Sequence, residues 1–225
     1  MNIQQLRKST KLPLSVLKNA FEMYGRNSKT LEHALNKAIQ DYAISFKNNV
    51  TKFKTFGYFV SEDHTSGVVL SLVSETNSTI TRETLSDYAS FLAKNIHNGI
   101  CVEEYVDTLL NGVISYLGEN ITLGSVYHFN KQDDGSILIF YPSYLNGAVI
   151  TIRLMVDKEK FNKAILHNLL KEFDSFFRSY NSEYRRKTKP TLTLDECCIS
   201  MSRKSLKKQG LTDVVKVSDI KIFGM

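Results

Sequence analysis

The sequence predicts an α+β protein: a helical N-terminal part followed by two halves that each combine a sheet with helices. Three observations support this fold class. Apolar residues recur at helical spacing in the first 46 residues, short β-branched runs then alternate with longer helical patterns, and that order recurs after residue 118. With 225 residues and 42% hydrophobic content, the chain is long enough to bury a substantial core. We expect domains over 1–46, 47–117 and 118–225.

The N-terminal segment is predicted to be a bundle of three short helices. The first covers Gln4–Lys8, and Pro13 is suited to the first position of the second. Gly25 is expected to end the second helix with a positive φ, which glycine adopts at low cost. An unbroken i, i+3, i+4 stripe marks the third helix: Leu31, Ala34, Leu35, Ala38, Ile39 and Tyr42. A bundle this small favours a binding module.

The stretch from 56 to 96 contains the loop on which we expect the functional contact. A strand over Phe56–Ser61 leads through a turn into a buried strand over Val68–Val73. The polar run Ser74–Thr79 follows, and its hydroxyls are placed to cap the next helix. A polar loop held between a buried strand and a helix can contact a partner without belonging to the core. A second helix then ends at Gly118.

The remaining sequence repeats the combination of strands and helix. Four elements are predicted here: strands Leu123–Asn130, Ser136–Tyr141 and Ala148–Val156, and a long helix Phe161–Tyr180. Gln132–Gly135 is typical of a hairpin turn joining the first two strands. A final short strand at Ile220–Ile222 is expected to pair back onto a sheet.

The sequence lacks the patterns of catalytic and metal sites. The histidines are scattered, no cysteine has metal-ligand spacing, and no glycine-rich phosphate loop occurs. We therefore expect no enzyme activity, cofactor or small-molecule substrate. Cys101, Cys197 and Cys198 give an odd count, which favours a reducing compartment. No apolar run approaches the length of a membrane span.

The net charge of +6 is compatible with nucleic acid or an acidic protein as partner. Two basic clusters stand out: Arg185, Arg186, Lys187 and Lys189, and then Arg203, Lys204, Lys207 and Lys208. Nucleic-acid binding would require interleaved stacking aromatics, and only Tyr180 and Tyr184 lie near these clusters. We do not expect nucleic acid as the partner, and a solvated loop or helix face is the preferred interpretation of the clusters.

Four short motifs follow one another along the chain. The first is Leu6-Arg7-Lys8-Ser9-Thr10, followed by Leu14, Lys18, Ala20, Phe21 and Gly25. The others are Glu75-Thr76 after an apolar strand, Gly118-Glu119-Asn120-Ile121, and the weaker Asn146-Gly147-Ala148-Val149-Ile150. In this order and spacing, over most of residues 2–177, the motifs resemble the elongation factor Ts family, the nucleotide-exchange factors of elongation factor Tu. The region after Tyr180 matches poorly, and an inserted helical hairpin of bacterial members is replaced by a basic loop.

The resemblance implies a ubiquitin-associated-like fold for the N-terminal bundle and two tandem core subdomains. It implies elongation factor Tu as partner, bound by a monomer in a 1:1 complex. The partner-binding residues that it implies are Leu12, Pro13, Glu75, Thr76, Asn77, Ser78, Tyr144, Asn146 and Gly147. The shortened C-terminal half resembles organellar members, so we expect a mature protein of the mitochondrial matrix.

The chain departs from the family pattern within the loop itself. Where the family has Asp-Phe after Glu-Thr, this chain has Asn77-Ser78. The family's pair presses on the partner's nucleotide-binding domain and loosens GDP, and a loop without the aromatic side chain should transmit less strain. Two functions stay open: an exchange factor that relies on other contacts as well, and a family member that binds as a scaffold without promoting exchange.

Overall fold

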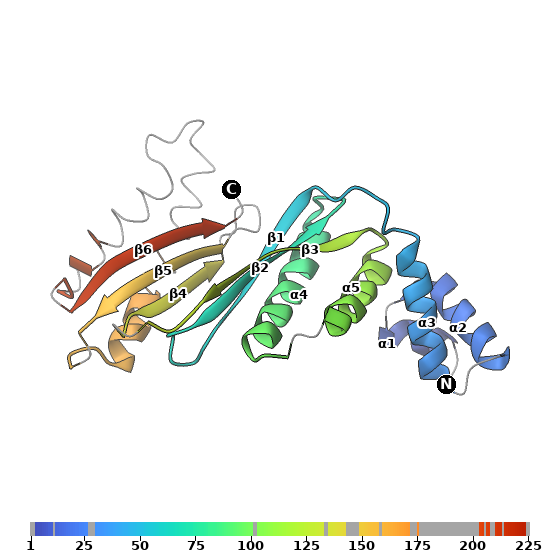
Figure 1. The fold of residues 1–225 in the computed structure, drawn as a ribbon, viewed down its shortest axis with the longest axis horizontal. Coiled ribbons are helices and arrows are strands. Elements are labelled where there is room, and N and C mark those ends of the chain that lie inside the picture. The colour runs from blue at the N-terminus through green and yellow to red at the C-terminus, as the bar shows by residue number, and fades with distance from the viewer. Residues whose placement is uncertain are drawn as a thin grey trace. The chain divides into compact units, whose positions relative to one another are not determined.

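The computed structural model (Figure 1) describes residues 3–10, 12–26, 30–100, 103–132, 135–142, 149–157, 159–171, 175, 203–204, 206–207, 210–212 and 214–223. The elements are α1 (Ile3–Thr10), α2 (Leu14–Arg26), α3 (Leu31–Ile44), β1 (Phe53–Val60), β2 (Gly67–Ser74), α4 (Thr79–His97), α5 (Glu103–Leu117), β3 (Ile121–Phe129), β4 (Ile137–Pro142), β5 (Val149–Val156) and β6 (Val215–Phe223). Three N-terminal helices precede two antiparallel three-stranded sheets with helices, which confirms the α+β class.

The chain forms two compact units, and several elements contribute to both. One comprises residues 1–54, 72–84 and 100–124, and the other 55–71, 85–99 and 125–225. The strands β1, β2 and β3 and the helix α4 each have residues in both units. The predicted boundaries after residues 46 and 117 stay a prediction.

In the first unit, α1, α2 and α3 form the predicted bundle. Its buried core consists of Leu6, Leu12, Val16, Leu17, Ala20 and Ala38. Thr30 caps α3, because its hydroxyl accepts a hydrogen bond from His33 N at 3.1 Å. The helix α5 joins this bundle by packing on α3, where Ser115 Oγ donates to Ile39 O at 3.0 Å.

The first sheet has the strand order β1-β2-β3, so β2 is central. All but one residue of β2 are buried, as its continuous apolar run predicts. In the second unit α4 packs closely on β1: Tyr58 N donates to Ser90 Oγ at 3.3 Å. The apolar face of α4 is buried as predicted, with Leu85, Ala89, Leu92 and Ala93 fully inaccessible.

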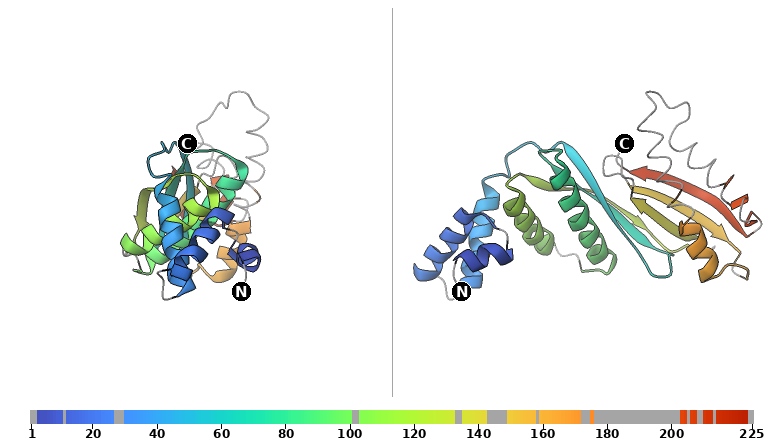
Figure 2. Two further views of the ribbon diagram at one scale, coloured as in Figure 1. Left: turned by 90° about the vertical axis from the view of Figure 1, so that its right-hand side faces the viewer. Right: turned by 180° about the vertical axis from the view of Figure 1, so that it is seen from behind.

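The second sheet, with the order β4-β5-β6, belongs wholly to the second unit. Ile150, Ile152 and Leu154 of β5 face a buried core that a helix over residues 163–171 covers (Figures 1 and 2). The terminal strand pairs back as predicted but is longer, with Ile220 opposite Ile152. The hairpin predicted between the strands around residues 123–130 and 136–141 is wrong, because β3 and β4 belong to different sheets. The strand β4 pairs with β5 instead, in antiparallel register from Ile137 opposite Leu154 to Pro142 opposite Val149.

Two predicted helix ends have different outcomes. Gly118 has φ +71° immediately after α5 and ends that helix as expected. The prediction for Gly25 is wrong: it has no positive φ, and α2 continues to Arg26. A glycine in a helix keeps its backbone hydrogen bonds, so it does not end the helix by itself.

Candidate partner-binding site

The polar loop between β2 and α4 is fixed by a buried carboxylate from a distant part of the chain. Glu119, only 6% exposed, accepts hydrogen bonds from Thr76 N (2.8 Å) and Thr76 Oγ1 (3.1 Å). It also accepts one from Thr81 Oγ1 in the first turn of α4, at 2.8 Å. Hydrogen bonds to an ionised acceptor are stronger than neutral ones. Glu119 therefore joins the loop and the start of α4 to the segment that leads from α5 into β3.

A second set of hydrogen bonds fixes the preceding residue. Glu75 Oε1 accepts from Asn49 Nδ2 at 2.9 Å and from the backbone N of Asn120. Asn120, itself 3% exposed, donates from Nδ2 to Asn49 O at 2.7 Å and to Lys47 O at 3.3 Å. The two sequence motifs, Glu-Thr and Gly-Glu-Asn-Ile, thus meet in one network. That meeting gives Glu75 and Thr76 a structural role.

Ser78 is the N-terminal cap of α4, as the hydroxyl-rich loop predicts. Its Oγ accepts a hydrogen bond from Thr81 N at 3.0 Å, three residues into the helix. The same hydroxyl donates to Thr81 Oγ1 at 2.8 Å, which connects the cap to Glu119. Both hydrogen bonds of the Ser78 side chain thus lie within the loop and the helix start.

Asn77 is a residue of the loop that remains available to a partner. It is exposed, and its side chain makes no hydrogen bond or ion pair with the part of the chain that the structure describes. Fixed residues lie on both sides of it. The neighbouring hydrogen bonds therefore hold the backbone of Asn77 in a defined position, and its side-chain amide has no hydrogen bond to a described residue.

The other predicted contact residues do not join this loop. Leu12 is buried in the core of the helical bundle, and Pro13 is half-buried where α2 begins, with its carbonyl accepting from Leu17 N at 3.2 Å. Tyr144, Asn146 and Gly147 lie outside the described residues. So do the first basic cluster and Lys208, whereas Arg203, Lys204 and Lys207 are exposed.

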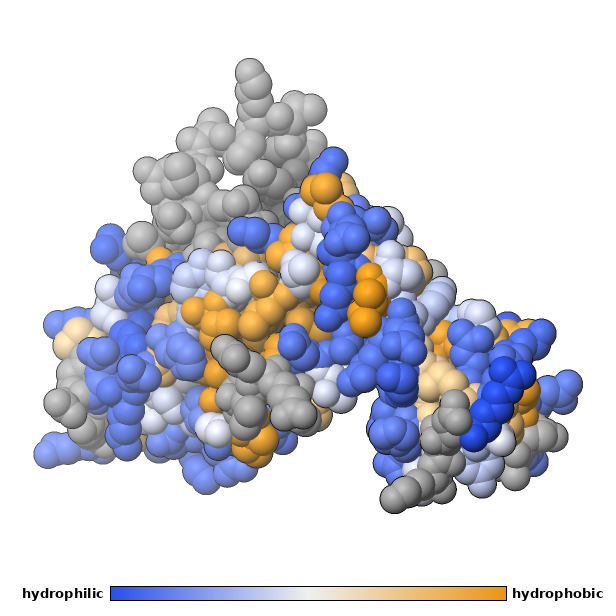
Figure 3. Space-filling view, turned by 45° about the vertical axis from the view of Figure 1, so that its right-hand side comes forward, coloured by the Kyte–Doolittle hydropathy of each residue, from blue (hydrophilic) through white to orange (hydrophobic). Residues whose placement is uncertain are grey.

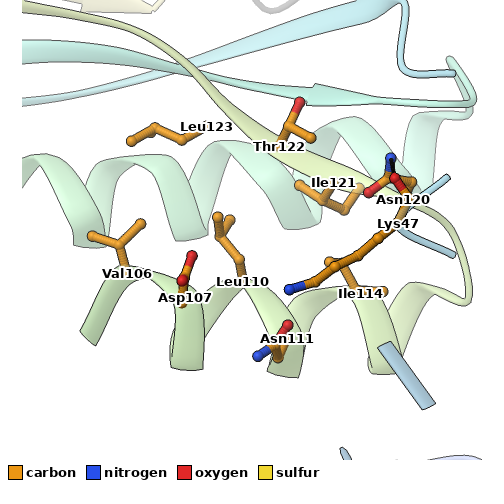
Figure 4. Close-up of a pocket in the computed structure, with 10 residues that line it drawn as sticks. All are labelled: Lys47, Val106, Asp107, Leu110, Asn111, Ile114, Asn120, Ile121, Thr122 and Leu123. Carbon is orange, nitrogen blue, oxygen red and sulfur yellow. Dashed lines mark hydrogen bonds between the residues drawn. The ribbon is translucent and has the colours of Figure 1, made fainter. Parts of the chain in front are cut away.

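A groove of about 530 Å³ lies in the first unit between α5 and the start of β3 (Figure 4). Its apolar lining includes Val106, Leu110, Ile114, Ile121 and Leu123. Its polar lining consists of Lys47, Asp107, Asn111, Asn120 and Thr122. Asn120 connects the groove to the hydrogen-bond network of the loop. Of the predicted partner-binding residues that the structure describes, none lines it.

Sequence reasoning did not assign roles to Glu119, Asn49 or Asn111. A signal for Glu119 exists, since it is an acidic residue between a helix-ending glycine and a strand, where an exposed turn would be the ordinary expectation. Its partners are 38 and 43 residues away in the sequence. No local pattern encodes contacts at that separation. The burial of Asn111 is harder still to predict from the sequence, because a single polar residue in a helix usually faces solvent.

Among the residues that the structure describes, no three His, Cys, Asp or Glu side chains are grouped to hold a metal ion. None of the described helices combines the length and the hydrophobicity that crossing a bilayer requires. Compared with known proteins, the chain matches no protein-family model and no curated protein sequence.

Proposed function

We propose that this chain is a guanine-nucleotide exchange factor for elongation factor Tu in translation elongation. The ordered motifs support this proposal, and the observation that carries it is the loop. Glu75, Thr76 and Ser78 are fixed by hydrogen bonds, and Asn77 between them is exposed and unpaired in the described chain. A contact residue whose backbone is fixed before binding loses less conformational entropy when a partner docks than one in a free loop.

The proposed mechanism follows from thermodynamic linkage. A factor that binds the nucleotide-free partner more tightly than the GDP-bound partner must weaken GDP binding by the same ratio. The contact at Asn77 is proposed to be made preferentially in the nucleotide-free form. With no aromatic side chain in the loop, the N-terminal bundle and the segment around residues 144–147 would supply the remaining coupling.

The proposal includes the finer fold and the location of the protein. We take α1–α3 to be a ubiquitin-associated-like bundle and the two sheets with their helices to be tandem core subdomains. The protein would act as a monomer in a 1:1 complex within the mitochondrial matrix, and it would need no cofactor. Localisation of a tagged full-length protein tests the compartment.

A second function is favoured by one observation, the use of Ser78 as a helix cap. A side chain that points into its own loop cannot press on a partner. Asn77 and Ser78 have an amide and a hydroxyl where the family has a carboxylate and an aromatic ring. The chain would then bind elongation factor Tu, or the ribosome, as a scaffold without accelerating GDP release.

Stopped-flow release of a fluorescent GDP analogue from elongation factor Tu distinguishes the two functions. Substoichiometric amounts of an exchange factor accelerate release catalytically, whereas a scaffold binds and leaves the intrinsic rate unchanged. If Asn77 makes the contact, Asn77→Ala should lower the acceleration roughly fivefold, as expected for the loss of one interface residue worth about 1 kcal/mol. Asn130→Ala, at an exposed asparagine just after β3, is the matched control and should change nothing. Absence of both binding and acceleration would exclude both functions.

A further inference from the structure

The groove between α5 and β3 contains polar groups that the proposed contact loop does not use. Asn111 is 8% exposed, and its Oδ1 atom is buried without a hydrogen-bond partner among the residues that the structure describes. A buried acceptor left unpaired is costly, and most such groups in folded proteins are paired. Asn111 lines the groove (Figure 4), so a half-turn of its amide would bring this oxygen to the groove, where a bound N–H group would satisfy it.

Two opposite charges line the same groove. Lys47 and Asp107 are both exposed, and neither makes an ion pair or side-chain hydrogen bond with the described part of the chain. Figure 4 shows the Lys47 side chain extending from the β3 side of the groove toward α5, which carries Asp107 and Asn111. The groove thus offers a cation, an anion and a buried acceptor.

The rest of the lining is aliphatic. Val106 and Leu110 of α5 and Ile121 of β3 are buried or nearly so, and Leu123 is 37% exposed. Figure 3 shows one face of the molecule, on which hydrophobic residues gather in patches among hydrophilic ones. An aliphatic lining with a few polar groups, in a volume of about 530 Å³, is typical of a small-molecule site.

We propose that this groove binds a free apolar α-amino acid. Its carboxylate would pair with Lys47, and its ammonium group would donate to Asn111 Oδ1 and face Asp107. Its side chain would lie against Val106, Leu110 and Ile121. A zwitterion with an aliphatic side chain is the ligand class that complements all three polar groups and the apolar lining together. The site goes beyond nucleotide exchange and does not depend on it.

Titration of the isotope-labelled full-length protein with L-leucine, followed by NMR, tests the site directly. We expect saturable shifts of the Asn111 side-chain amide and of residues around the groove, with a Kd of about 1 mM or tighter for so small a ligand. Isopentylamine and 4-methylpentanoic acid each lack one charged group of leucine. Each should bind at least about fivefold more weakly, as the loss of one charge-assisted contact predicts.

Two variants and a control assign the shifts to the groove. Asn111→Leu removes the unpaired oxygen and Lys47→Met removes the cation, and both should abolish saturable leucine binding. Lys52→Met, at another exposed lysine nearby in the sequence, should leave it unchanged. A cooperative thermal unfolding transition establishes that each variant is folded. Because Lys47 is exposed, its replacement should not disturb the packing of the core.

Three results would overturn the proposal. One is a leucine titration that leaves the groove resonances unmoved at concentrations well above the expected Kd. Another is binding that survives in Asn111→Leu. The third is a groove that responds to elongation factor Tu alone, which would assign it to a protein interface. No step of this test uses GDP release, so failure to bind leucine does not contradict the proposed exchange function. Failure to accelerate GDP release likewise does not contradict leucine binding in the groove.

Discussion

At the scale of single residues, Glu119 is the side chain on which the candidate site depends most. Its carboxylate accepts three hydrogen bonds, two from Thr76 and one from Thr81. Glu119→Ala leaves the backbone N of Thr76 and both hydroxyls without their acceptor. We expect the free energy of unfolding to fall by about 2–3 kcal/mol, measured by urea denaturation.

Glu83→Ala is the control for this change, because Glu83 is exposed on α4. Its effect should stay within about 0.5 kcal/mol, as for most surface substitutions. Equal effects of the two alanine variants would show that the Glu119 hydrogen bonds contribute no net stability. A loss confined to Glu119→Ala would support the fixed loop on which the proposed function rests.

Residue-scale predictions from the sequence were right for the cap at Ser78 and wrong for the helix end at Gly25, and they did not identify distant partners. The cap formed by Ser78 follows from helix-start rules that need only neighbouring residues. The pairing of Thr76 with Glu119 depends on how β2 and β3 bring two loops together, and periodicity carries no such information. The motif resemblance marked both segments without indicating that they contact each other.

At the scale of elements, the contact between β1 and α4 depends on Gly57. A Cβ added there would lie 2.6 Å from the Cβ of Ala89 and closer still to the backbone of Ser90. Gly57→Ala should therefore force β1 and α4 apart and lower the free energy of unfolding by about 1–3 kcal/mol, as overpacking does.

Gly112→Ala is the matched control for Gly57→Ala. Gly112 lies within α5, and an added Cβ there meets nothing within 4 Å. Alanine in the interior of a helix is favoured over glycine by about 0.5–1 kcal/mol, so this variant should be more stable than the native protein. Chemical denaturation of both variants should give opposite signs. A stabilised Gly57→Ala would contradict the close approach of β1 to α4.

The turn between β1 and β2 should give the stability a dependence on acid pH. Hydrogen bonds from the Ser61 hydroxyl, and then from the Thr65 hydroxyl and backbone N, lower the pKa of Asp63 to about 2. A lowered pKa means that the charged form stabilises the fold above the pKa of an unfolded carboxyl, about 3.9. That stabilisation is lost as the pH falls toward 2. It should be small, because the Asp63 side chain is 58% exposed.

Asp63→Asn tests this dependence. The unfolding temperatures of the native protein and Asp63→Asn should differ most above pH 4 and converge as the pH falls toward 2. Asp87→Asn is the control, since Asp87 is exposed on α4 and accepts no hydrogen bond from a described residue. An NMR titration of the Asp63 carboxyl that finds an ordinary value would overturn the assignment.

Elements with strong hydrophobic patterns were predicted well, and their pairing was not. The continuous apolar composition of β2 predicts a buried strand, and the helical period of the apolar residues in α4 predicts its buried face. In β6, by contrast, Lys216, Ser218 and Lys221 interrupt the apolar residues, so only its end was predicted as a strand. The turn before β4 was predicted to be a hairpin because the preference for a turn depends only on the residues within it. Whether β4 pairs with β3 or with β5 is decided by packing, which the turn residues do not encode.

At the scale of the whole molecule, each compact unit contains a core of its own. Leu17 is fully buried in the helical bundle of the first unit, and Ile152 is fully buried at the centre of the second sheet. The strands β1–β3 and the helix α4 contribute residues to both units, so the chain crosses between the cores several times. Whether the two cores unfold together is therefore a physical question that matched substitutions can answer.

Leu17→Ala and Ile152→Ala create comparable cavities in the two cores, and each should cost about 2–5 kcal/mol. If each unit opens separately, Leu17→Ala should speed amide hydrogen exchange in α2 and α3 and leave β4–β6 protected. Ile152→Ala should then do the reverse. We expect this separation, because the amides of α2–α3 and of β4–β6 belong to different units and are stabilised by different cores. Equal acceleration of exchange in both regions by either variant would instead show one cooperative block, in which a partner that binds one core would stabilise the other.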